Sequence, residues 1–170
     1  MQYQSTRDKT QKVSASRAIL QGLSAEGGLF VPEQLPKFSG QHLEKMVSQD
    51  YIRRAQEILG EFLSDFSNEE IESCLKGAYD AKKFSGSQIA PLSKLGENAY
   101  LLELWHGPTC AFKDMALQLL PRLMTVSMQK SGDGKEIVIL VATSGDTGKA
   151  ALEGFCNVPG IRIVVFYPEE

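Results

Sequence analysis

Apolar residues in the first half of the chain recur every three or four positions, which is the period of helices with one buried face. Serine or aspartate, whose side chains accept hydrogen bonds from the unpaired N–H groups at helix starts, precedes each apolar run. The pattern predicts four helices, which begin after Ser14, Ser39, Asp50 and Ser67. Glu70 completes a capping box with Ser67 at the start of the fourth helix.

The second half of the chain contains apolar runs typical of β-strands. Residues 99–104 form one predicted strand, and residues 137–142 are six consecutive apolar, mostly β-branched side chains. A continuous run of this kind suits a parallel strand that is covered on both faces. A short helix and another strand at residues 161–166 follow, so the sequence predicts a strand–helix–strand unit.

These elements predict an α/β protein in two parts. Glycine, serine and proline interrupt the periodicity between Lys82 and Leu95. We expect a helical N-terminal domain at residues 1–90 and, at residues 91–170, the beginning of a doubly wound parallel-sheet domain. Two strands leave hydrogen-bonding edges open and an apolar face uncovered, so we expect this second domain to be incomplete within the sequence.

Composition and charge argue against several classes of function. The 170 residues are 42% hydrophobic and 23% charged with a net charge of −3, and no basic patch suggests nucleic acid binding. The longest apolar run is far below the roughly 18 residues of a membrane span, and the polar start is not a signal peptide. We therefore expect a cytoplasmic protein that binds neither nucleic acid nor membrane.

The cysteines and histidines do not form the clusters that hold metal ions. Cys74, Cys110 and Cys156 are odd in number and widely spaced, and only His42 and His106 accompany them. We expect reduced thiols and no metal site. Cys110 is expected to be a small buried side chain, with a redox or catalytic role as the alternative because it lies close to Lys113 in the sequence. For His106 the sequence leaves two roles open, a structural histidine bound to a backbone carbonyl and a proton carrier.

Lys113 stands at the start of a helix with an apolar face, where a lysine has little structural reason to be. In the first helical turn it would face the positive end of the macrodipole, which lowers the pKa of the amine and makes it nucleophilic near neutral pH. Such an amine is suited to forming a Schiff base with an aldehyde. The alternative is a solvated surface lysine beside a core helix. Pro121 lies within this helix and is expected to kink or divide it.

The segment from Thr143 to Gly148 connects the predicted strand to the following helix and has the features of an anion-binding turn. Unpaired N–H groups at the helix start, with the hydroxyls of Ser144 and Thr147, would hold a carboxylate or a phosphate. A nucleotide-binding loop does not fit, because a Walker loop needs glycine in place of Thr143 and the dinucleotide fingerprint needs a third glycine. A purely structural turn remains the alternative.

Four motifs, in this order along the chain, resemble the threonine synthase family. They are YQSTRD at residues 3–8, AEGGLFVPEQLP at 25–36, HGPTCAFKD at 106–114 and TSGDTGKAA at 143–151. Asp8 departs from the glycine that the family usually carries there. The resemblance implies a pyridoxal-phosphate enzyme with the fold of the tryptophan-synthase-β-like family, of which this chain is the N-terminal portion.

The resemblance also implies a reaction, the conversion of O-phospho-L-homoserine and water to L-threonine and phosphate with pyridoxal 5′-phosphate as cofactor. Lys113 would carry the cofactor as a Schiff base and act as general base and acid. The residues that would grip the substrate α-carboxylate are Thr143, Ser144, Gly145, Asp146 and Thr147. Asp146 is expected to cap the following helix rather than touch the substrate. The residues predicted to reach the substrate phosphate, with a surface or inter-domain role as the alternative, are Ser5, Thr6 and Arg7.

Two other functions remain open from the sequence. A related pyridoxal-phosphate lyase would eliminate phosphate and release a 2-oxo acid. A non-catalytic module would use the turn at Thr143 to bind anions and would have no need of Lys113. By the resemblance, the family's later portion supplies the groups that hold the cofactor phosphate and the pyridine nitrogen. We therefore expect this polypeptide alone to hold the cofactor weakly and not to turn over.

Overall fold

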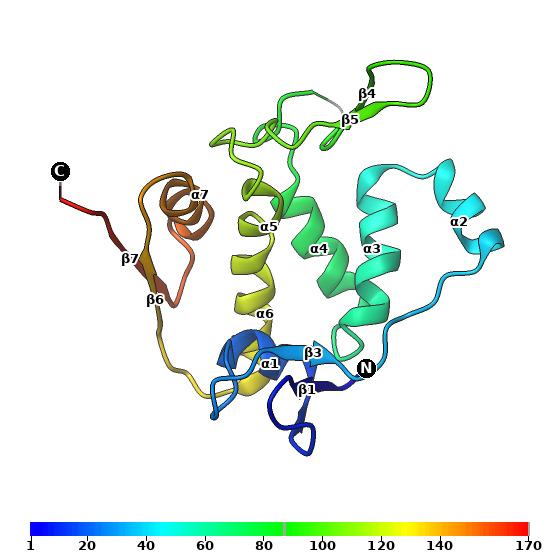
Figure 1. Cartoon of the computed structure of the whole chain (residues 1–170). Helices are drawn as coiled ribbons and strands as arrows, with labels where there is room; N and C mark the ends of the chain where they lie inside the picture. The colour runs from blue at the N-terminus through cyan, green and yellow to red at the C-terminus, as the bar shows by residue number, and fades with distance from the viewer. Residues whose placement is uncertain (87, 170) are drawn as a thin grey trace. The chain divides into compact units, whose positions relative to one another are not determined.

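A computed structural model of the chain describes residues 1–86 and 88–169 and shows helices with small sheets (Figure 1). The mixed α/β class predicted from the sequence is confirmed. The chain divides into two compact units, of which the first is Met1–Leu75 with Val126–Gly134 and the second is Lys76–Thr125 with Lys135–Glu170. The domain ranges predicted from the sequence, 1–90 and 91–170, stay a prediction.

The first unit combines a small antiparallel sheet with helices. The sheet has the strand order β2–β1–β3, with bounds Lys12–Val13, Tyr3–Ser5 and Phe30–Pro32. The helices are α1 (Ala15–Gln21), α2 (Gly40–Val47), α3 (Tyr51–Phe62) and the first part of α4 (Asn68–Ala78). The sequence pattern did not predict this sheet, because strands of two or three residues are too short to show a period.

Each of the four helices begins with a side-chain cap where the sequence predicted one. The hydroxyls of Ser14 and Ser39 and the carboxylate of Asp50 accept hydrogen bonds from N–H groups three residues ahead. Ser67 and Glu70 form the capping box, with N–H to side-chain oxygen distances of 2.7 and 3.2 Å. Such caps satisfy N–H groups that a helix start leaves unpaired, and the four predicted helix starts are confirmed.

The core of the first unit is apolar. The side chains that lie buried there include Ala15, Met46, Leu63, Phe66, Ile71 and Leu75. Burying a large aliphatic or aromatic side chain contributes about 1.5–3 kcal/mol to stability. Met46, Ile71 and Leu75 lie on the helix faces that the three- and four-residue spacing predicts to be buried. The same spacing also points Leu43 and Val47 of α2 inwards, and this is wrong, because they are 52% and 77% exposed.

The second unit contains an antiparallel hairpin, two short helical segments and a parallel strand pair. The hairpin strands are β4 (Leu92–Lys94) and β5 (Tyr100–Leu102). The helical segments are α5 (Asp114–Leu117) and the first part of α6 (Leu120–Ser131). Strand β5 confirms the strand predicted at residues 99–104.

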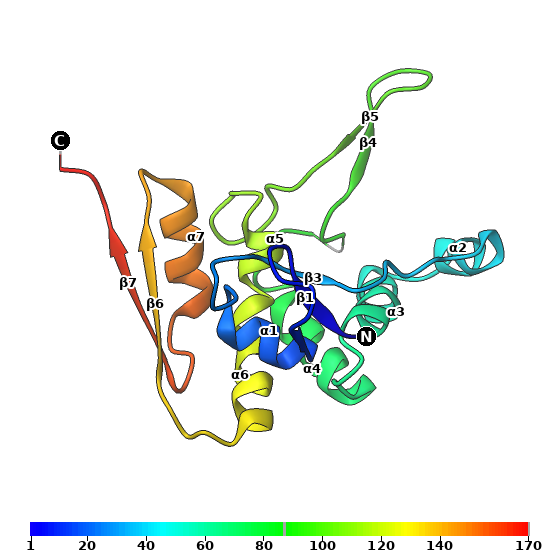
Figure 2. The ribbon, with the colours of Figure 1, turned by 60° about the horizontal axis from the view of Figure 1, so that its bottom comes forward.

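A strand–helix–strand unit closes the described chain, as the sequence predicted. Strands β6 (Ile137–Ala142) and β7 (Ile161–Phe166) are parallel neighbours, and α7 (Asp146–Phe155) connects them (Figure 2). In the described residues β6 is covered on one face only, which agrees with the expectation that two strands leave an apolar face uncovered. Its side chains alternate between half-buried and exposed, with Val138 at 54% and Leu140 at 67% exposure. One face of the pair packs against α7 and the other is open.

The helix predicted after Lys113 is divided, and Pro121 is the cause. Helix α5 ends at Leu117, and α6 begins at Leu120. A proline has no N–H, so the hydrogen bond that residue 121 would donate to the carbonyl of Leu117 cannot form. The prediction that Pro121 kinks or divides this helix is confirmed.

Candidate functional site

Lys113 directly precedes α5 and occupies its N-cap position. The sequence placed Lys113 one residue further along, in the first turn of a long helix, and this detail is wrong because α5 has only four residues. A single turn has a weak macrodipole, so the dipole argument for Lys113 loses most of its force. The side chain is half-buried, and its Nζ lies 4.1 Å from the centroid of the Phe112 ring. This geometry keeps the amine close to an apolar surface.

The loop that leads to Lys113 is held by Asp114. The Asp114 carboxylate is fully buried and accepts hydrogen bonds of 2.8 Å from both the N–H and the hydroxyl of Thr109. Gly107 lies against the same side chain, because a Cβ at this glycine would lie 2.5 Å from the Asp114 Cβ. The Asp114 carboxylate therefore fixes the segment from Gly107 to Lys113 at both ends: it follows Lys113 directly in the chain, and it contacts Gly107 and Thr109 at the beginning of the segment.

Cys110 lies within this loop in a conformation that few side chains adopt. Its φ is +60°, and its N–H donates to the carbonyl of Gly107 at 3.1 Å. The expectation that Cys110 is a small buried side chain is wrong, because its thiol is exposed. The turn faces the thiol outwards, since Thr109 and Ala111 on either side are the residues that point inwards.

His106 belongs to a network of polar side chains immediately before the loop. Its Nε2 lies 2.6 Å from the Glu103 carboxylate, and its Nδ1 lies 3.1 Å from the Ser85 hydroxyl. The Ser93 hydroxyl also donates to Glu103, and these bonds from Ser93 and His106 lower the pKa of the Glu103 carboxyl. The ring of His106 thus binds side chains, and the predicted bond from a structural histidine to a backbone carbonyl is not formed. A role as proton carrier stays a prediction.

The turn from Thr143 to Thr147 follows β6 and leads into α7. The Thr143 hydroxyl accepts a hydrogen bond of 3.3 Å from the N–H of Gly145, and Gly145 is the N-cap residue of α7. The expectation that Asp146 caps this helix is wrong, because Asp146 is the first helical residue and no side-chain cap bond forms. The N–H groups of Asp146 and Thr147 have no acceptor among the described residues. They are the donors that an incoming anion would find.

Gly148 anchors this turn on the strand pair. A Cβ at Gly148 would lie 2.5 Å from the Thr143 methyl, 2.9 Å from a Val165 methyl and 3.1 Å from the Tyr167 hydroxyl. Only glycine allows the helix to approach the strands so closely. The sequence places Gly148 at the end of the turn, and the structure shows that its role is close packing against the strands.

Lys113 and the turn belong to the same unit, and α5 packs against α7. Gly154 in α7 lies directly against the Leu117 carbonyl, which Pro121 leaves without its helical N–H partner. Among the described residues, no hydrogen bond or ion pair joins Lys113 to residues 143–147. The two parts of the unit suit different chemical groups. The amine of Lys113 is suited to an aldehyde such as that of pyridoxal phosphate, and the N–H donors of the turn are suited to an anionic group of a substrate.

Ser5, Thr6 and Arg7 lie in the first unit, where they hold β1 to the following loop. The Ser5 hydroxyl is buried and binds Ser24 and Glu26, while the Arg7 guanidinium donates to the Glu26 carbonyl at 2.9 Å. Thr6 bonds Leu29 through both its N–H and its hydroxyl. These contacts are structural, and the substrate-phosphate role of the three residues stays a prediction.

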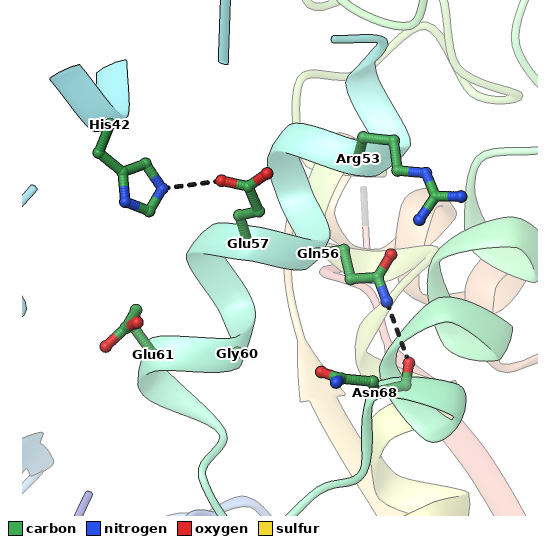
Figure 3. Close-up of a pocket in the computed structure, with 7 residues that line it drawn as sticks. All are labelled: His42, Arg53, Gln56, Glu57, Gly60, Glu61 and Asn68. Atoms are coloured by element: carbon green, nitrogen blue, oxygen red, sulfur yellow. Dashed lines mark hydrogen bonds and ion pairs between the residues drawn. The ribbon is translucent and has the colours of Figure 1, made fainter. Parts of the chain in front are cut away.

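The first unit also has a hollow of about 530 Å³ that no predicted site residue lines. Figure 3 shows His42 of α2 turned towards Glu57 of α3, with 2.7 Å between Nε2 and the carboxylate. On the other side of α3, Gln56 donates to the Asn68 carbonyl at 3.3 Å. Arg53 lines the same hollow and is exposed. Sequence reasoning missed this hollow, because its residues are ordinary helix-surface side chains.

Neither a metal centre nor a membrane span is found in the described residues. No group of three or more His, Cys, Asp and Glu side chains there is placed to hold a metal ion. Residues 1–86 and 88–169 also contain no helix with both the length and the apolarity needed to cross a membrane.

Comparison with known proteins agrees with the four motifs. The family description "Threonine synthase N terminus" matches residues 2–79. Threonine synthase of Pseudomonas aeruginosa is 38% identical over 169 residues, a match that covers 99% of this chain and 35% of that protein. Threonine synthase-like 1 of Homo sapiens is 40% identical over 173 residues, covering 95% of this chain and 23% of that protein.

The structural comparison leads to the same proteins. PLP-bound threonine synthase from Brucella melitensis superimposes with a TM-score of 0.91 at 35% identity, covering 99% of this chain and 36% of that one. The chain therefore spans about a third of the length of the bacterial relatives it matches. Residues 2–79 are similar to the threonine synthase N-terminal region, and the α/β fold of the whole chain is similar to the corresponding part of the solved enzyme. In sequence and in structure the chain matches the N-terminal portion of threonine synthases, and the resemblance of its motifs to this family is confirmed.

Proposed function

We propose that this chain is the N-terminal portion of a pyridoxal-phosphate-dependent threonine synthase, which converts O-phospho-L-homoserine and water to L-threonine and phosphate. The observation that carries the proposal is the loop from Gly107 to Lys113, which a buried carboxylate fixes at both ends and which presents a half-buried amine. A mere surface lysine would need no such support. The matched structure described as PLP-bound adds the cofactor to the proposal.

Lys113 has two tasks in this proposal. Its Nζ would hold the cofactor through the aldehyde, and as a free amine it would move protons at the α and β carbons of the substrate. When bound, pyridoxal phosphate supplies the electron sink for this chemistry. The Asp114 carboxylate and Thr109 keep the loop, and hence Nζ, in a constant position during these transfers.

The turn from Thr143 to Thr147 holds the α-carboxylate of the substrate. The unpaired N–H groups of Asp146 and Thr147 donate to it, and the hydroxyls of Ser144 and Thr147 are placed on the same segment. Asp146 carries a negative charge beside this site, so its side chain must point away from the bound carboxylate. Ser5, Thr6 and Arg7 remain candidates for the substrate phosphate, and a cytoplasmic location is part of the same proposal.

The experiment that tests the lysine is labelling of the chain with pyridoxal phosphate, followed by borohydride reduction and peptide mass mapping. The matched control is Lys83, which is half-buried in the same unit and donates to Gln118 at 2.7 Å. Burial and the nearby Arg122 lower the pKa of the Lys83 amine, so it is the strongest competing nucleophile. Modification concentrated at Lys113, and lost in Lys113→Ala, supports the proposal. Modification concentrated at Lys83 contradicts the assignment of the site.

Two further measurements separate the alternative functions. Product analysis on a protein of full family length distinguishes threonine from the 2-oxo acid that a related lyase would release. A non-catalytic anion-binding module predicts that Lys113→Ala leaves all ligand binding unchanged. Labelling that spreads evenly over the lysines of this chain would mean that Lys113 is not activated in this chain alone. Repeating the experiment on a protein of full family length would then decide between two causes. Labelling concentrated at Lys113 there would mean that the rest of the protein is needed to build the site, and even labelling would mean that the assignment of Lys113 is wrong.

A further inference from the structure

A second hollow in the first unit, of about 250 Å³, lies between residues at the start of α1 and residues at the end of α6. Drug-sized ligands occupy pockets of about 300–1,000 Å³, so this hollow suits a smaller molecule. The polar side chains that line it include Ser14, Ser16, Arg17, Ser127, Lys130 and Asp133. None of them has a part in the function proposed above.

Ser127 is the reason to assign a ligand to this hollow. Its side chain is fully buried, and its hydroxyl has no partner among the described residues. Hydroxyls on a helix commonly donate to a carbonyl one turn earlier, as Thr125 and Ser131 of α6 do to Pro121 and Met128 at 3.0 and 2.9 Å. Buried hydroxyls are rarely left unpaired, so Ser127 is expected to bond something inside the hollow.

The other hydroxyls of the hollow are already engaged. Ser16 donates to the Asp65 carboxylate through both its hydroxyl and its N–H, at 2.5 and 3.1 Å. Ser14 caps α1 and shares a hydrogen bond of 3.0 Å with Ser16. Ser127 is therefore the hydroxyl with a hydrogen to give.

The charges around the hollow are of both signs. No ion pair joins the exposed guanidinium of Arg17 to the described residues, and the same holds for the Asp133 carboxylate. Lys130 lies 2.8 Å from Glu70 and keeps further N–H donors. Asp133 and the nearby Asp65 oppose a multiply charged anion such as phosphate. A molecule with one carboxylate and one ammonium group matches the charges better.

We propose that this hollow binds a small α-amino acid in its zwitterionic form. The Arg17 guanidinium binds the carboxylate through two parallel N–H bonds, which is the preferred geometry of this pair. The Asp133 carboxylate accepts from the ammonium group. The Ser127 hydroxyl donates to a carboxylate oxygen and so gains the partner that it lacks.

The test is a titration of the ¹⁵N-labelled chain with glycine and L-alanine, followed by NMR. We expect saturable shifts of the amides of residues 14–17 and 127–133. Acetate and methylammonium each carry half of the zwitterion and are expected to bind about tenfold more weakly. Sulfate is the rival probe, and tighter binding of sulfate than of glycine would overturn the proposal in favour of a simple anion site. No saturable shift with either amino acid would overturn it as well.

Variants connect the binding to the named residues. Arg17→Gln, Asp133→Asn and Ser127→Ala are each expected to weaken glycine binding at least about fivefold. Ser127→Ala removes no hydrogen bond among the described residues and should keep the thermal midpoint of the chain, which excludes unfolding as the cause. Arg53→Gln, in the hollow of Figure 3, is the matched control and should leave the titration unchanged. Unchanged binding by Ser127→Ala, or weaker binding by Arg53→Gln, would contradict the assignment.

Discussion

The buried carboxylate of Asp114 accepts two hydrogen bonds of 2.8 Å from Thr109, one from the backbone N–H and one from the hydroxyl. The two residues enclose the segment from Cys110 to Lys113. A carboxylate without exposure to water requires such partners, because an unpaired buried charge is strongly unfavourable. The bond pair therefore links the stability of the second unit to the position of Lys113.

Removal of the Thr109 hydroxyl is expected to destabilise the chain. Hydrogen bonds to charged groups contribute about 1.5–3 kcal/mol, and Thr109→Ala should lower the free energy of unfolding in urea by about this amount. Thr109→Ser keeps the hydroxyl and should lose less than half as much. Equal losses in the two variants would show that packing of the methyl group, and not the hydrogen bond, holds the loop.

Two helical glycines should respond in opposite directions to alanine. At Gly154 of α7 a Cβ would collide with the Leu117 carbonyl, while at Gly60 of α3 it would meet no atom within 4 Å. Overpacking costs about 1–3 kcal/mol, so Gly154→Ala should lower the free energy of unfolding by this amount. Gly60→Ala should raise it by about 0.5–1 kcal/mol, because alanine loses less backbone entropy in a helix. A stabilising Gly154→Ala would mean that α5 and α7 are not in contact in solution.

Local patterns carried most of the fold prediction. The helix caps at Ser14, Ser39 and Asp50 and the apolar run of β6 lie within a few residues of the elements they define, so the sequence shows them directly. The sheet of β1, β2 and β3 escaped prediction because its short strands pair across distant parts of the chain. Exposure of one face of β6 depends on what covers the strand, and a hydrophobic run contains no such information.

The residues of the candidate site can be read from the sequence, but the contacts that support them cannot. Lys113 is a charged residue beside an apolar helix, and the turn at Thr143 combines glycines and hydroxyls after an apolar strand. Both lie within short sequence motifs, so the sequence alone shows them. The supports of the site are tertiary contacts between residues that look ordinary. Asp114 could be recognised as a helix-start carboxylate, but its burial and its bonds to Thr109 could not. Gly148 was assigned to a turn, because its approach to Val165 is visible only in the folded chain.

Asp65 is expected to make the stability of the first unit depend on pH in the acid range. Burial by itself raises the pKa of Asp65, but hydrogen bonds from the hydroxyl and N–H of Ser16 outweigh it and hold the pKa below its ordinary value. A carboxyl with a lowered folded pKa stabilises the fold above the unfolded pKa of about 3.9, and the contribution is lost as pH falls through the folded value.

Ser16→Ala tests this dependence. The variant should be less stable than wild type at neutral pH, and the difference in the free energy of unfolding should shrink as pH falls below about 3.9. Urea unfolding at a series of pH values measures it, with Ser48→Ala as a control because the exposed Ser48 hydroxyl only donates to the Lys45 carbonyl. A difference for Ser16→Ala that stays constant with pH would assign the loss to packing rather than to the pKa of Asp65.

The two faces of the β6–β7 pair should respond differently to substitution. Leu140 is 67% exposed on the open face, so Leu140→Ser should change the free energy of unfolding by no more than about 0.5 kcal/mol. Ile161 is 8% exposed and pairs with Ile137, so Ile161→Ala should cost about 2–5 kcal/mol. Val138, Leu140, Val164 and Phe166 form an exposed apolar surface, which favours association of the isolated chain.

Sedimentation velocity of Leu140→Ser measures that association. The expected result is a shift towards monomer at concentrations where wild type self-associates, with the urea midpoint unchanged. Val31→Ser, at another exposed apolar residue on β3, is a control that should leave sedimentation as in wild type. A large loss of stability in Leu140→Ser would show that the open face is covered in solution by part of the same chain. Equal sedimentation of wild type and Leu140→Ser would show that this surface does not drive association.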